Sequence, residues 1–434
     1  MRVERDGDGR IRVMAIADSD SYLKWSAALL GALPGEGWET DLAVVRSPVA
    51  PSAEQVRAAV AGTPLAGREV PVRGALELRT RLLRERPDVL MLNCTGPVVD
   101  ALAHALAGEY RPVLVSGLPG ISVPATERAW LYRSTVDLFV LHSHREVAEF
   151  TGLGARLGAT GAVGLATLPF LPEPRPRAGA AVGAGTAAGT GAGAGAGRPR
   201  VVFASQAKVP AEHGQREQVL LGLAALAEAR PDLEVVVKLR AREDEAQTHR
   251  ERYHYEALWR YMAARGEVRA DAVAFRTGPM VEYLEDAAGF VTVSSTAALE
   301  AFALDVPTLV LTDFGLNAEQ INLVFEGSGV LGTLDDVRAA RFRRVDPDWL
   351  RANYFHPVHE NDWVRRLTAL VAAGRRGELP RRESLLSGPE QQRRRTRSLM
   401  RLSLPPTAVR QLGRARRRLR ALRANLRGTL TSRE

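Results

Sequence analysis

The sequence predicts an α/β protein in which two doubly wound parallel sheets form separate lobes of the 434-residue chain. In both halves, short apolar runs alternate with amphipathic stretches, as strands alternate with helices. The runs are apolar at nearly every position, which is typical of parallel strands that helices cover on both faces. A stretch of Gly, Ala and Thr from 178 to 197 separates the two halves. With 45% hydrophobic residues overall, each half can bury its own core.

The first half carries five apolar runs, and we expect it to form an N-terminal lobe over residues 10–172. The predicted strands are 11–17, 41–45, 88–93, 112–117 and 137–142, and the clearest helical patterns are SYLKWSAALLGAL (21–33) and PVVDALAHALAG (97–108). The stretch LPEPRPR that follows contains three prolines, which cannot continue a helix, and the Gly/Ala stretch has no side chain able to anchor a core. We therefore predict a flexible linker over 173–199.

The second half repeats the alternation, and we expect it to form a lobe over 200–375. The predicted strands are 201–204, 234–237, 289–293 and 307–312, and the helical patterns are 215–229, 250–264 and 296–304. Two such lobes in tandem predict a cleft between them. Ligands of open parallel sheets bind beyond the carboxyl ends of the strands, so the loops that follow the strands are the expected sites.

Charge and cysteine content narrow the class of protein. The formal net charge is +9, yet residues 381–434 alone hold 16 arginines and three glutamates, so the remainder carries −4. A basic balance confined to one end indicates an appended surface-binding element, and we do not expect nucleic acid as a partner. With no secretory signal and no run of 18 apolar residues, we expect a cytoplasmic protein. The single cysteine, Cys94, excludes an internal disulfide and a multi-cysteine metal site, and we expect it to be buried.

Lysine is rare in this chain, because 56 of the 59 basic residues are arginine. Lys24, Lys208 and Lys238 each follow a predicted strand. A lysine ammonium is a compact point charge that suits end-on contact with a diphosphate, whereas arginine suits planar, bidentate contacts. Lys238 and Arg240 lie two residues apart and share a face if the extended conformation continues. The lysines therefore predict an anion site, with chance placement as the alternative.

Hydroxyl side chains gather in VTVSSTAALEAFALDVPTLVL (291–311), where Ser294, Ser295 and Thr296 lie between a strand and a helix. Hydroxyl donors beside the unpaired N–H groups of a helix start are typical of a phosphate site. Glu300 follows Thr296 by four residues, so one helical face can present both to one ligand. The alternatives are helix capping by the hydroxyls and a solvated carboxylate at Glu300.

The segment SSTAALEAFALDVPTLVL resembles the nucleotide-binding segment of GT-B glycosyltransferases, especially the bacterial capsular-polysaccharide and sialyltransferase-like enzymes. In those enzymes a Ser/Thr pair precedes a helix with a glutamate, followed by a small-residue turn, a proline and another strand. The stretches IADSDSYLKW and SGLPGISVPATERAWLYRS also resemble a bacterial family named only for an assumed glycosyltransferase activity. The similarity covers residues 10 to 370 apart from the linker.

The resemblance implies a metal-independent glycosyltransferase that moves a sugar from a nucleotide-sugar donor, used as co-substrate without a cofactor, to a cell-surface polysaccharide or glycolipid. Its second lobe would bind the donor, with hydroxyls on the phosphates and Glu300 on the ribose. Where the resembling enzymes often carry a Lys or His-Pro element, this chain has Lys238-Leu239-Arg240, which leaves the nucleotide base open. The expected donor set is Lys238, Arg240, Ser294, Ser295, Thr296, Glu300, Gln206 and Lys208.

In the first lobe, Asp18 and Asp20 follow the first predicted strand, and one of them could be the general base that deprotonates an acceptor hydroxyl. Asp18 and Asp20 also match a short DxD manganese motif, and Asp20 or Ser21 could instead cap the following helix; both interpretations stay open. We expect no metal. The predicted acceptor side comprises Lys24, Gly117, Pro119, Gly120 and His142.

The basic segment 376–434 contains an amphipathic helical pattern. Apolar side chains recur at spacings of three and four at Leu412, Ala415, Leu419, Leu422 and Leu426, flanked by arginines. Such a helix can lie on an anionic membrane, pair as a coiled coil or bind nucleic acid, and a solvated tail is the other alternative. We favour the inner membrane surface, because enzymes of surface polysaccharides act on membrane-proximal acceptors.

Two other functions fit the same sequence. A transferase that moves glycerol phosphate or another phosphorylated polyol from CDP would keep the fold and change the reaction. A non-catalytic scaffold that binds membranes or polyanions through the basic end would belong to another class, and fold alone does not choose between them.

Overall fold

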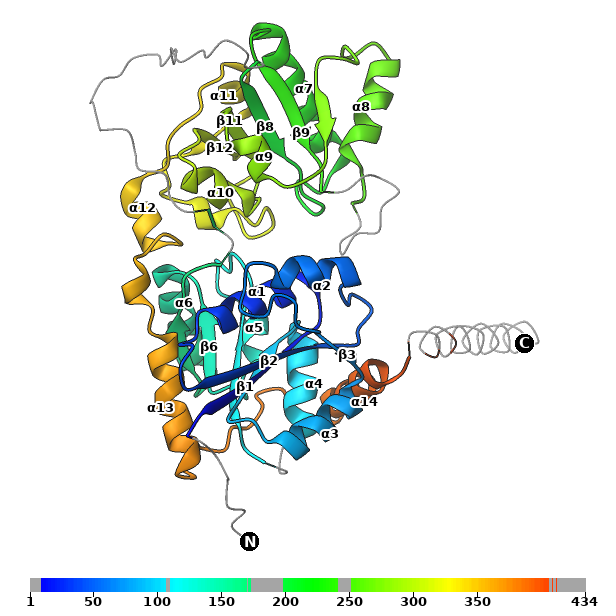
Figure 1. The fold of residues 1–434 in the computed structure, drawn as a ribbon. Helices are drawn as coiled ribbons and strands as arrows, with labels where there is room; N and C mark the ends of the chain where they lie inside the picture. Colours follow the sequence, from blue (N-terminus) through cyan, green and yellow to red (C-terminus); the bar gives the residue numbers. More distant parts are fainter. Residues whose placement is uncertain are drawn as a thin grey trace, which may run out of the picture.

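The computed structural model describes residues 9–106, 110–169, 171–172, 198–240 and 251–405, together with 408 and 411. The chain forms two α/β lobes, each built on one parallel sheet (Figure 1). The predicted linker core, 178–197, and the leucine stripe from 412 to 426 lie outside the described residues. None of the helices in the described ranges combines the length and apolar composition that crossing a bilayer requires.

The first sheet has seven parallel strands in the order β3-β2-β1-β4-β5-β6-β7. The strands are β1 Ile11–Ala17, β2 Trp38–Val45, β3 Val72–Arg73, β4 Val89–Asn93, β5 Val113–Gly117, β6 Leu138–Leu141 and β7 Ala162–Leu165. The order reverses at β1, which pairs with β2 on one side and β4 on the other. Loops after β1 and β4 therefore open at the switch point, where doubly wound sheets bind ligands.

Helices cover both faces of the first sheet with separate apolar cores. One face is covered by α1 Asp20–Gly31, α2 Ala53–Val60 and α13 Trp363–Arg375. The other is covered by α3 Ala75–Glu85, α4 Gly96–Leu106, α5 Glu127–Leu131, α6 His144–Leu157 and α14 Pro389–Ser403. Because both faces are buried, the strands are apolar on both sides, as the unbroken runs predicted.

The second sheet has six parallel strands in the order β10-β9-β8-β11-β12-β13. They are β8 Arg200–Ala204, β9 Glu234–Lys238, β10 Ala274–Arg276, β11 Ala287–Thr292, β12 Thr308–Leu311 and β13 Leu331–Gly332. One face packs against α7 His213–Ala229, α8 Tyr255–Ala264 and α11 Leu334–Arg338. The other packs against α9 Val281–Leu284, α10 Ala297–Ala303, η1 Leu323–Phe325 and α12 Pro347–Ala352.

The predicted fold class is confirmed, with two doubly wound lobes in tandem. The strands that the sequence missed are β3, β7, β10 and β13, which have two to four residues each and lie at sheet edges. An edge strand of two residues carries no periodicity that could reveal it.

The predicted end of the second lobe at residue 375 is wrong. After η2, Val358–Glu360, the chain crosses back to the first lobe, and α13 packs on the first sheet through Trp363, Leu367 and Val371 (Figure 1). Backbone and side-chain bonds between Asp362 and Leu165 anchor the crossing. The first lobe is therefore assembled from residues at both ends of the described chain.

The predicted tail, 376–434, also begins as part of the first lobe. Arg382 and Arg111 both bond the buried carboxylate of Asp137, and Arg395 of α14 bonds Asp100 of α4. These arginines serve as structural partners of buried acids, because a buried carboxylate needs a cation or several donors nearby. The sequence pattern gave no sign of this, since arginines in a basic run look solvated.

Candidate functional site

The carboxyl edges of the two sheets face each other. Gly120 lies in the loop after β5 of the first sheet, and Thr296 lies in the loop after β11 of the second. A Cβ atom at Gly120 would be 3.9 Å from Cγ2 of Thr296. Residues that follow strands in both lobes therefore border one shared region (Figure 1).

Lys238 is the last residue of β9 and is 8% exposed. Its register places it beside Ala204 of β8, and its Nζ donates to the backbone oxygen of Leu239 at 2.8 Å. Burial lowers the pKa of Lys238, because the charged ammonium is desolvated, and the nearby Arg240 lowers it further. One carbonyl satisfies one of three ammonium donors, which leaves this cation suited to an anionic ligand.

Glu300 of α10 lies near Lys238, since each charge acts on the other. Burial raises the pKa of Glu300, and the positive charge of Lys238 opposes that shift. Arg240, two residues beyond Lys238, is exposed. The three predicted residues are thus brought to one edge, where Lys238 is buried, Glu300 is half-buried and Arg240 is exposed.

The hydroxyl cluster divides into three different roles. Ser294 is 5% exposed, and its Oγ accepts from Nε2 of Gln206 at 3.4 Å. Ser295 Oγ accepts from the backbone N–H of Ala297 at 3.2 Å, so it acts as a helix cap. Thr296 is exposed, and its side chain makes no capping bond. Because α10 has only seven residues, the side chains matter more here than the helix dipole.

The loop after β8 carries polar atoms that lack protein partners. Oγ of Ser205 and Oε1 of Gln206 are buried without a hydrogen bond, while Lys208 is exposed. Buried polar atoms are paired in most structures, so two unpaired ones in adjacent residues indicate a place where a ligand or water supplies donors. The sequence pointed to Gln206 and Lys208 and missed Ser205.

Arg216 of α7 holds this loop in place. It is 1% exposed, and all five of its N–H donors are used. The acceptors are the backbone oxygens of Gln206, Ala207, Pro210 and Tyr253 and the carboxylate of Glu251. One side chain therefore ties the loop after β8 to the segment that leads into α8.

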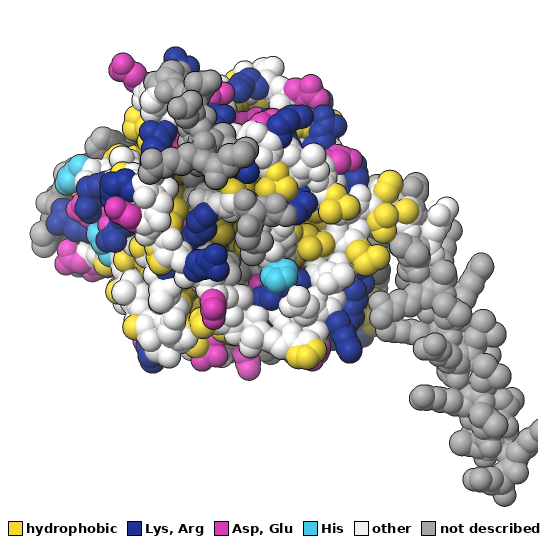
Figure 2. All heavy atoms as spheres, turned by 90° about the horizontal axis from the view of Figure 1, so that it is seen from below, with side chains coloured by type: hydrophobic (Ala, Val, Ile, Leu, Met, Phe, Trp, Pro, Cys, Tyr) yellow, Lys and Arg dark blue, Asp and Glu magenta, His cyan; other side chains and the backbone are white. Residues whose placement is uncertain are grey.

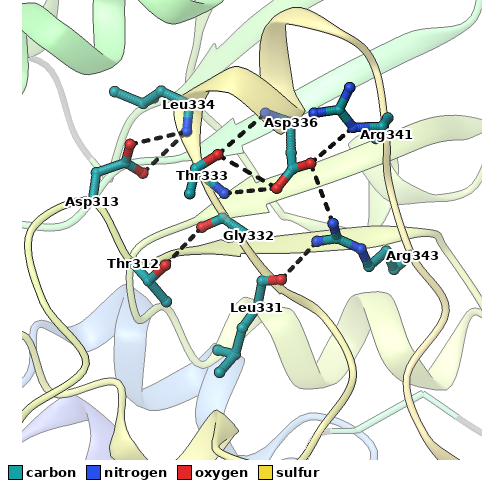
Figure 3. A network of polar contacts seen from close by, with 9 residues as sticks. All are labelled: Thr312, Asp313, Leu331, Gly332, Thr333, Leu334, Asp336, Arg341 and Arg343. Carbon is teal, nitrogen blue, oxygen red and sulfur yellow. Dashed lines mark hydrogen bonds and ion pairs between the residues drawn. The ribbon is translucent and has the colours of Figure 1, made fainter.

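A second network fixes the far edge of the same sheet (Figure 3). Asp313, two residues after β12, accepts from the N–H of Leu334 with both carboxylate oxygens, at 3.0 and 3.1 Å. Asp336 accepts from Thr333 N at 3.0 Å and pairs with Arg341 and Arg343. Asp313 is thereby occupied by the start of α11, so Glu300 is the carboxylate that remains near the donor candidates.

Asp18 follows β1 and is fully buried in the first lobe. Oδ2 accepts from the backbone N–H of Thr95 at 2.9 Å and from its hydroxyl at 2.5 Å, whereas Oδ1 is buried without a partner. Burial raises the pKa of Asp18, although the bonds from Thr95 and the charge of Arg133 act in the other direction. A carboxylate with one free oxygen and raised basicity suits a general base.

Asp20 and Lys24 occupy each other on α1. Lys24 Nζ donates to Oδ2 of Asp20 at 2.9 Å, one helical turn away. The predicted capping bond of Asp20 does not form, since the structure places the residue inside the helix after Ser19. Asp18 and Asp20 bond different neighbours, and Lys24 is paired within its own helix.

The predicted acceptor loop lies where the carboxyl edges of the two sheets face each other, but its residues have different roles. A Cβ atom at Gly117 would lie 2.4 Å from both Trp25 and the backbone oxygen of Val140, so only glycine fits there. Pro119 and Gly120, which follow in the loop after β5, are half-buried. We therefore assign Gly117 to packing and keep Pro119 and Gly120 as acceptor-side candidates.

His142 does not fit its predicted role as an acceptor contact. The ring is fully buried, Nε2 accepts from Trp25 Nε1 at 2.7 Å, and Nδ1 lies 3.0 Å from the backbone oxygen of Ala166. Burial lowers its pKa to about 4, so the ring is neutral at physiological pH. The correction follows from Trp25, whose contact across 117 residues no local pattern reveals.

Glu146 was not predicted, yet it is the most heavily bonded acid where the two lobes meet. It is fully buried at the start of α6 and accepts from Ser122 N at 2.7 Å, His142 N at 3.0 Å and Tyr354 Oη at 2.6 Å. Burial raises its pKa to about 7. Ser122 belongs to the acceptor loop and Tyr354 to the segment after α12, so Glu146 joins the two.

A family model described as "Putative glycosyltransferase (DUF6716)" matches residues 13–370. The fold is similar to S. aureus MnaA with UDP, at 11% identity and a TM-score of 0.50 over 86% of this chain and 99% of that one. A UDP-N-acetylglucosamine 2-epimerase gives 11% and 0.50 over 87% and 100%. The lipopolysaccharide outer core galactosyltransferase WaaB gives 9% and 0.45 over 85% and 100%. No curated protein sequence matches the chain.

Proposed function

The chain belongs to the DUF6716 family, and from that premise we propose that it transfers a sugar from a nucleotide-sugar donor to a hydroxyl of a polysaccharide or glycolipid. The fold is of the GT-B type, and the donor would lie at the carboxyl edge of the second sheet. A protein of similar fold, MnaA, was solved with UDP, which supports a nucleotide as a ligand of this fold.

The observation that carries the proposal is the buried cation at the end of β9. Lys238 is almost fully enclosed, retains unused donors and has unpaired polar atoms of Ser205 and Gln206 in the neighbouring strand's loop. A diphosphate would supply acceptors for the lysine and for the exposed hydroxyl of Thr296. As the glycosidic bond breaks, negative charge grows on the leaving phosphate, and a fixed cation stabilises that charge most.

We assign the general base to Asp18 in preference to Asp20. The acceptor hydroxyl would attack the anomeric carbon while its proton passes to the free Oδ1 of Asp18. Thr95 holds the other oxygen, which fixes the direction of the free one. In Asp20, Oδ1 also has no partner, but the cation of Lys24 already engages Oδ2.

The remaining predicted donor residues would contact different parts of the nucleotide, according to how exposed each side chain is. Glu300, half-buried beside Lys238, would accept from ribose hydroxyls, and the exposed Arg240 and Lys208 would meet the outer phosphate. Pro119 and Gly120 would line the acceptor side. We place the enzyme in the cytoplasm, at the inner face of the membrane, because the basic end is the part of the chain that suits an anionic surface.

The test is direct binding of nucleotides to the purified protein. Calorimetry with UDP, CDP, CMP, GDP and ADP, each alone and as a sugar conjugate, should find one nucleotide that binds and that raises the melting temperature. Lys238→Ala should remove that binding, while Lys24→Ala on the paired helix site should not. If no nucleotide binds, or if both variants bind alike, the donor site is wrong.

Two alternatives give different results in the same experiments. A CDP-polyol phosphotransferase would bind CDP selectively and give a product that contains phosphorus. A scaffold would bind no nucleotide, and removing residues 381–434 would abolish its binding to anionic polymers or vesicles.

A further inference from the structure

The last helix of the described chain is fixed to the first lobe in one orientation. Arg395 turns inward, and its guanidinium bonds both carboxylate oxygens of Asp100 on α4 at 2.9 and 2.7 Å, with both residues almost fully buried. Two turns later, Leu402 packs into the core that lies against the first sheet. Because these two residues hold one side of α14, the opposite side is held toward solvent.

The outward side of α14 combines positive charge with an exposed apolar side chain. Arg393, Arg397 and Arg401 are exposed, and Met400 among them is 57% exposed. The only acid of this helix pairs with a different arginine, and none of these three has an acidic partner within the described ranges. Three uncompensated charges on one short helix are therefore available to an external anion.

The start of α3 extends this surface with more apolar area. The backbone oxygen of Ser403 would lie 3.0 Å from a Cβ at Gly74 and accepts from Arg46 Nη1 at 3.3 Å, so the two helix ends touch. Leu76, two residues after Gly74, is 63% exposed, and Val72 is 42% exposed. We call this surface, made of Val72, Leu76, Arg393, Arg397, Met400 and Arg401, the α3–α14 face.

The α3–α14 face adjoins the edge that carries the proposed chemistry. Arg46 and Gly74 follow the carboxyl ends of β2 and β3, and β1, which precedes Asp18, pairs with β2. Figure 2, which looks up at the first lobe from below, shows hydrophobic and basic side chains close together on its right-hand part. From residue 405 the chain continues for 30 residues with nine arginines and one glutamate.

We propose that the α3–α14 face docks on an anionic lipid surface and thereby sets the carboxyl edge of the first lobe beside the membrane. Exposed leucine and methionine side chains enter the boundary between head groups and acyl chains, while arginines bind lipid phosphates. Peripheral membrane helices bind bilayers in the same way. Each arginine near an anionic leaflet strengthens binding about fivefold. The basic continuation adds attraction, but the described helix sets the orientation.

The experiment places a polarity-sensitive dye on single introduced cysteines in the full chain. Cys94 is fully buried, so an introduced thiol is labelled selectively. The labelled variants are Met400→Cys, Leu76→Cys and, as the matched control, Tyr261→Cys, which is 53% exposed on α8 of the other lobe. Each is mixed with vesicles of equal parts phosphatidylglycerol and phosphatidylcholine, and with phosphatidylcholine alone.

Docking predicts a blue shift and brighter emission for the dyes at 400 and 76 with phosphatidylglycerol only, and no change at 261. In sedimentation with the same vesicles, Arg393→Gln, Arg397→Gln and Arg401→Gln together should weaken binding 10- to 100-fold. The control triple, Arg230→Gln, Arg265→Gln and Arg269→Gln on the second lobe, should bind as the wild type does.

Three results would overturn the proposal. The first is vesicle binding with no dye response at 400 or 76, which would assign binding to the continuation alone. The second is an equal response at 261, and the third is a response at 400 that follows protein concentration or added RNA instead of vesicles. Because none of these readouts uses a nucleotide, the proposed transferase activity stands or falls separately.

Discussion

Replacing Arg216 with methionine is the sharpest test of how the donor edge is held. Methionine keeps most of the buried volume but removes all five donors, so Glu251 loses its partner while it stays almost fully buried. Removing one member of a buried ion pair costs about 3 to 5 kcal/mol, because the remaining charge is left without compensation. With an m-value of about 3 kcal/mol/M, the urea midpoint should fall by about 1 to 1.7 M.

A double variant separates lost packing from the stranded charge. In Arg216→Met with Glu251→Gln, no buried charge remains, and about half of the loss should return. The exposed Arg230 at the end of the same helix is the matched control, and Arg230→Met should change the unfolding free energy by less than about 0.5 kcal/mol. Urea unfolding followed by tryptophan fluorescence measures all three variants.

The same variants carry a pH dependence with a definite sign. Burial raises the pKa of Glu251, and the charge of Arg216 opposes that shift. Without the arginine the folded state holds a proton at higher pH, so the deficit of Arg216→Met should shrink as pH falls from 8 toward 5. A loss below 1 kcal/mol, or a double variant no more stable than the single one, would refute the reasoning.

Three further outcomes are expected. Burial raises the pKa of Glu146 to about 7 in the folded protein, against about 4.3 in the unfolded chain. The free energy of unfolding should therefore fall by about 1.4 kcal/mol per pH unit as pH rises between these two values. Glu146→Gln should remove that slope from urea unfolding curves. Lys238→Arg should weaken donor nucleotide binding about tenfold in calorimetry, because the larger planar group does not fit a buried ammonium position, whereas Lys24→Arg should change nothing. Asp18→Asn should lower donor turnover 10²- to 10⁴-fold at unchanged donor affinity, whereas Asp20→Asn should stay close to the wild type. Turnover of the wild-type enzyme should fall as pH drops through the raised pKa of Asp18, because the protonated carboxyl cannot act as a base.

The sequence was informative for strands and residues whose position in the fold follows from the local sequence pattern. The central strands β4 and β5 are buried at every position and nearly all apolar because both faces are covered, so they could be placed within a few residues. Lys238 and Asp18 could be found because each lies at the carboxyl end of such a strand, and parallel strands bring these ends to one edge. Glu300 joined Lys238 for the same reason, since α10 starts at that edge.

The roles of other residues could not be predicted from the sequence, because they depend on partners far along the chain. Arg216 lies in a helix whose polar positions look solvated, and only the loops that fold over it make it buried. His142 was expected on the acceptor side, but its ring is buried against Trp25, which lies 117 residues earlier in the chain. The amphipathic pattern of α13 predicts a covered sheet face but does not say which sheet, and that choice shifted the lobe boundary.

The return of α13 to the first lobe has a consequence for synthesis on the ribosome. Domains usually fold in the order in which they emerge, N-terminal first. Here the face of the first sheet that Trp363, Leu367 and Val371 cover stays open until those residues are translated, after the whole second sheet. The second lobe can therefore close first, and the lobe that begins the polypeptide is the one completed last.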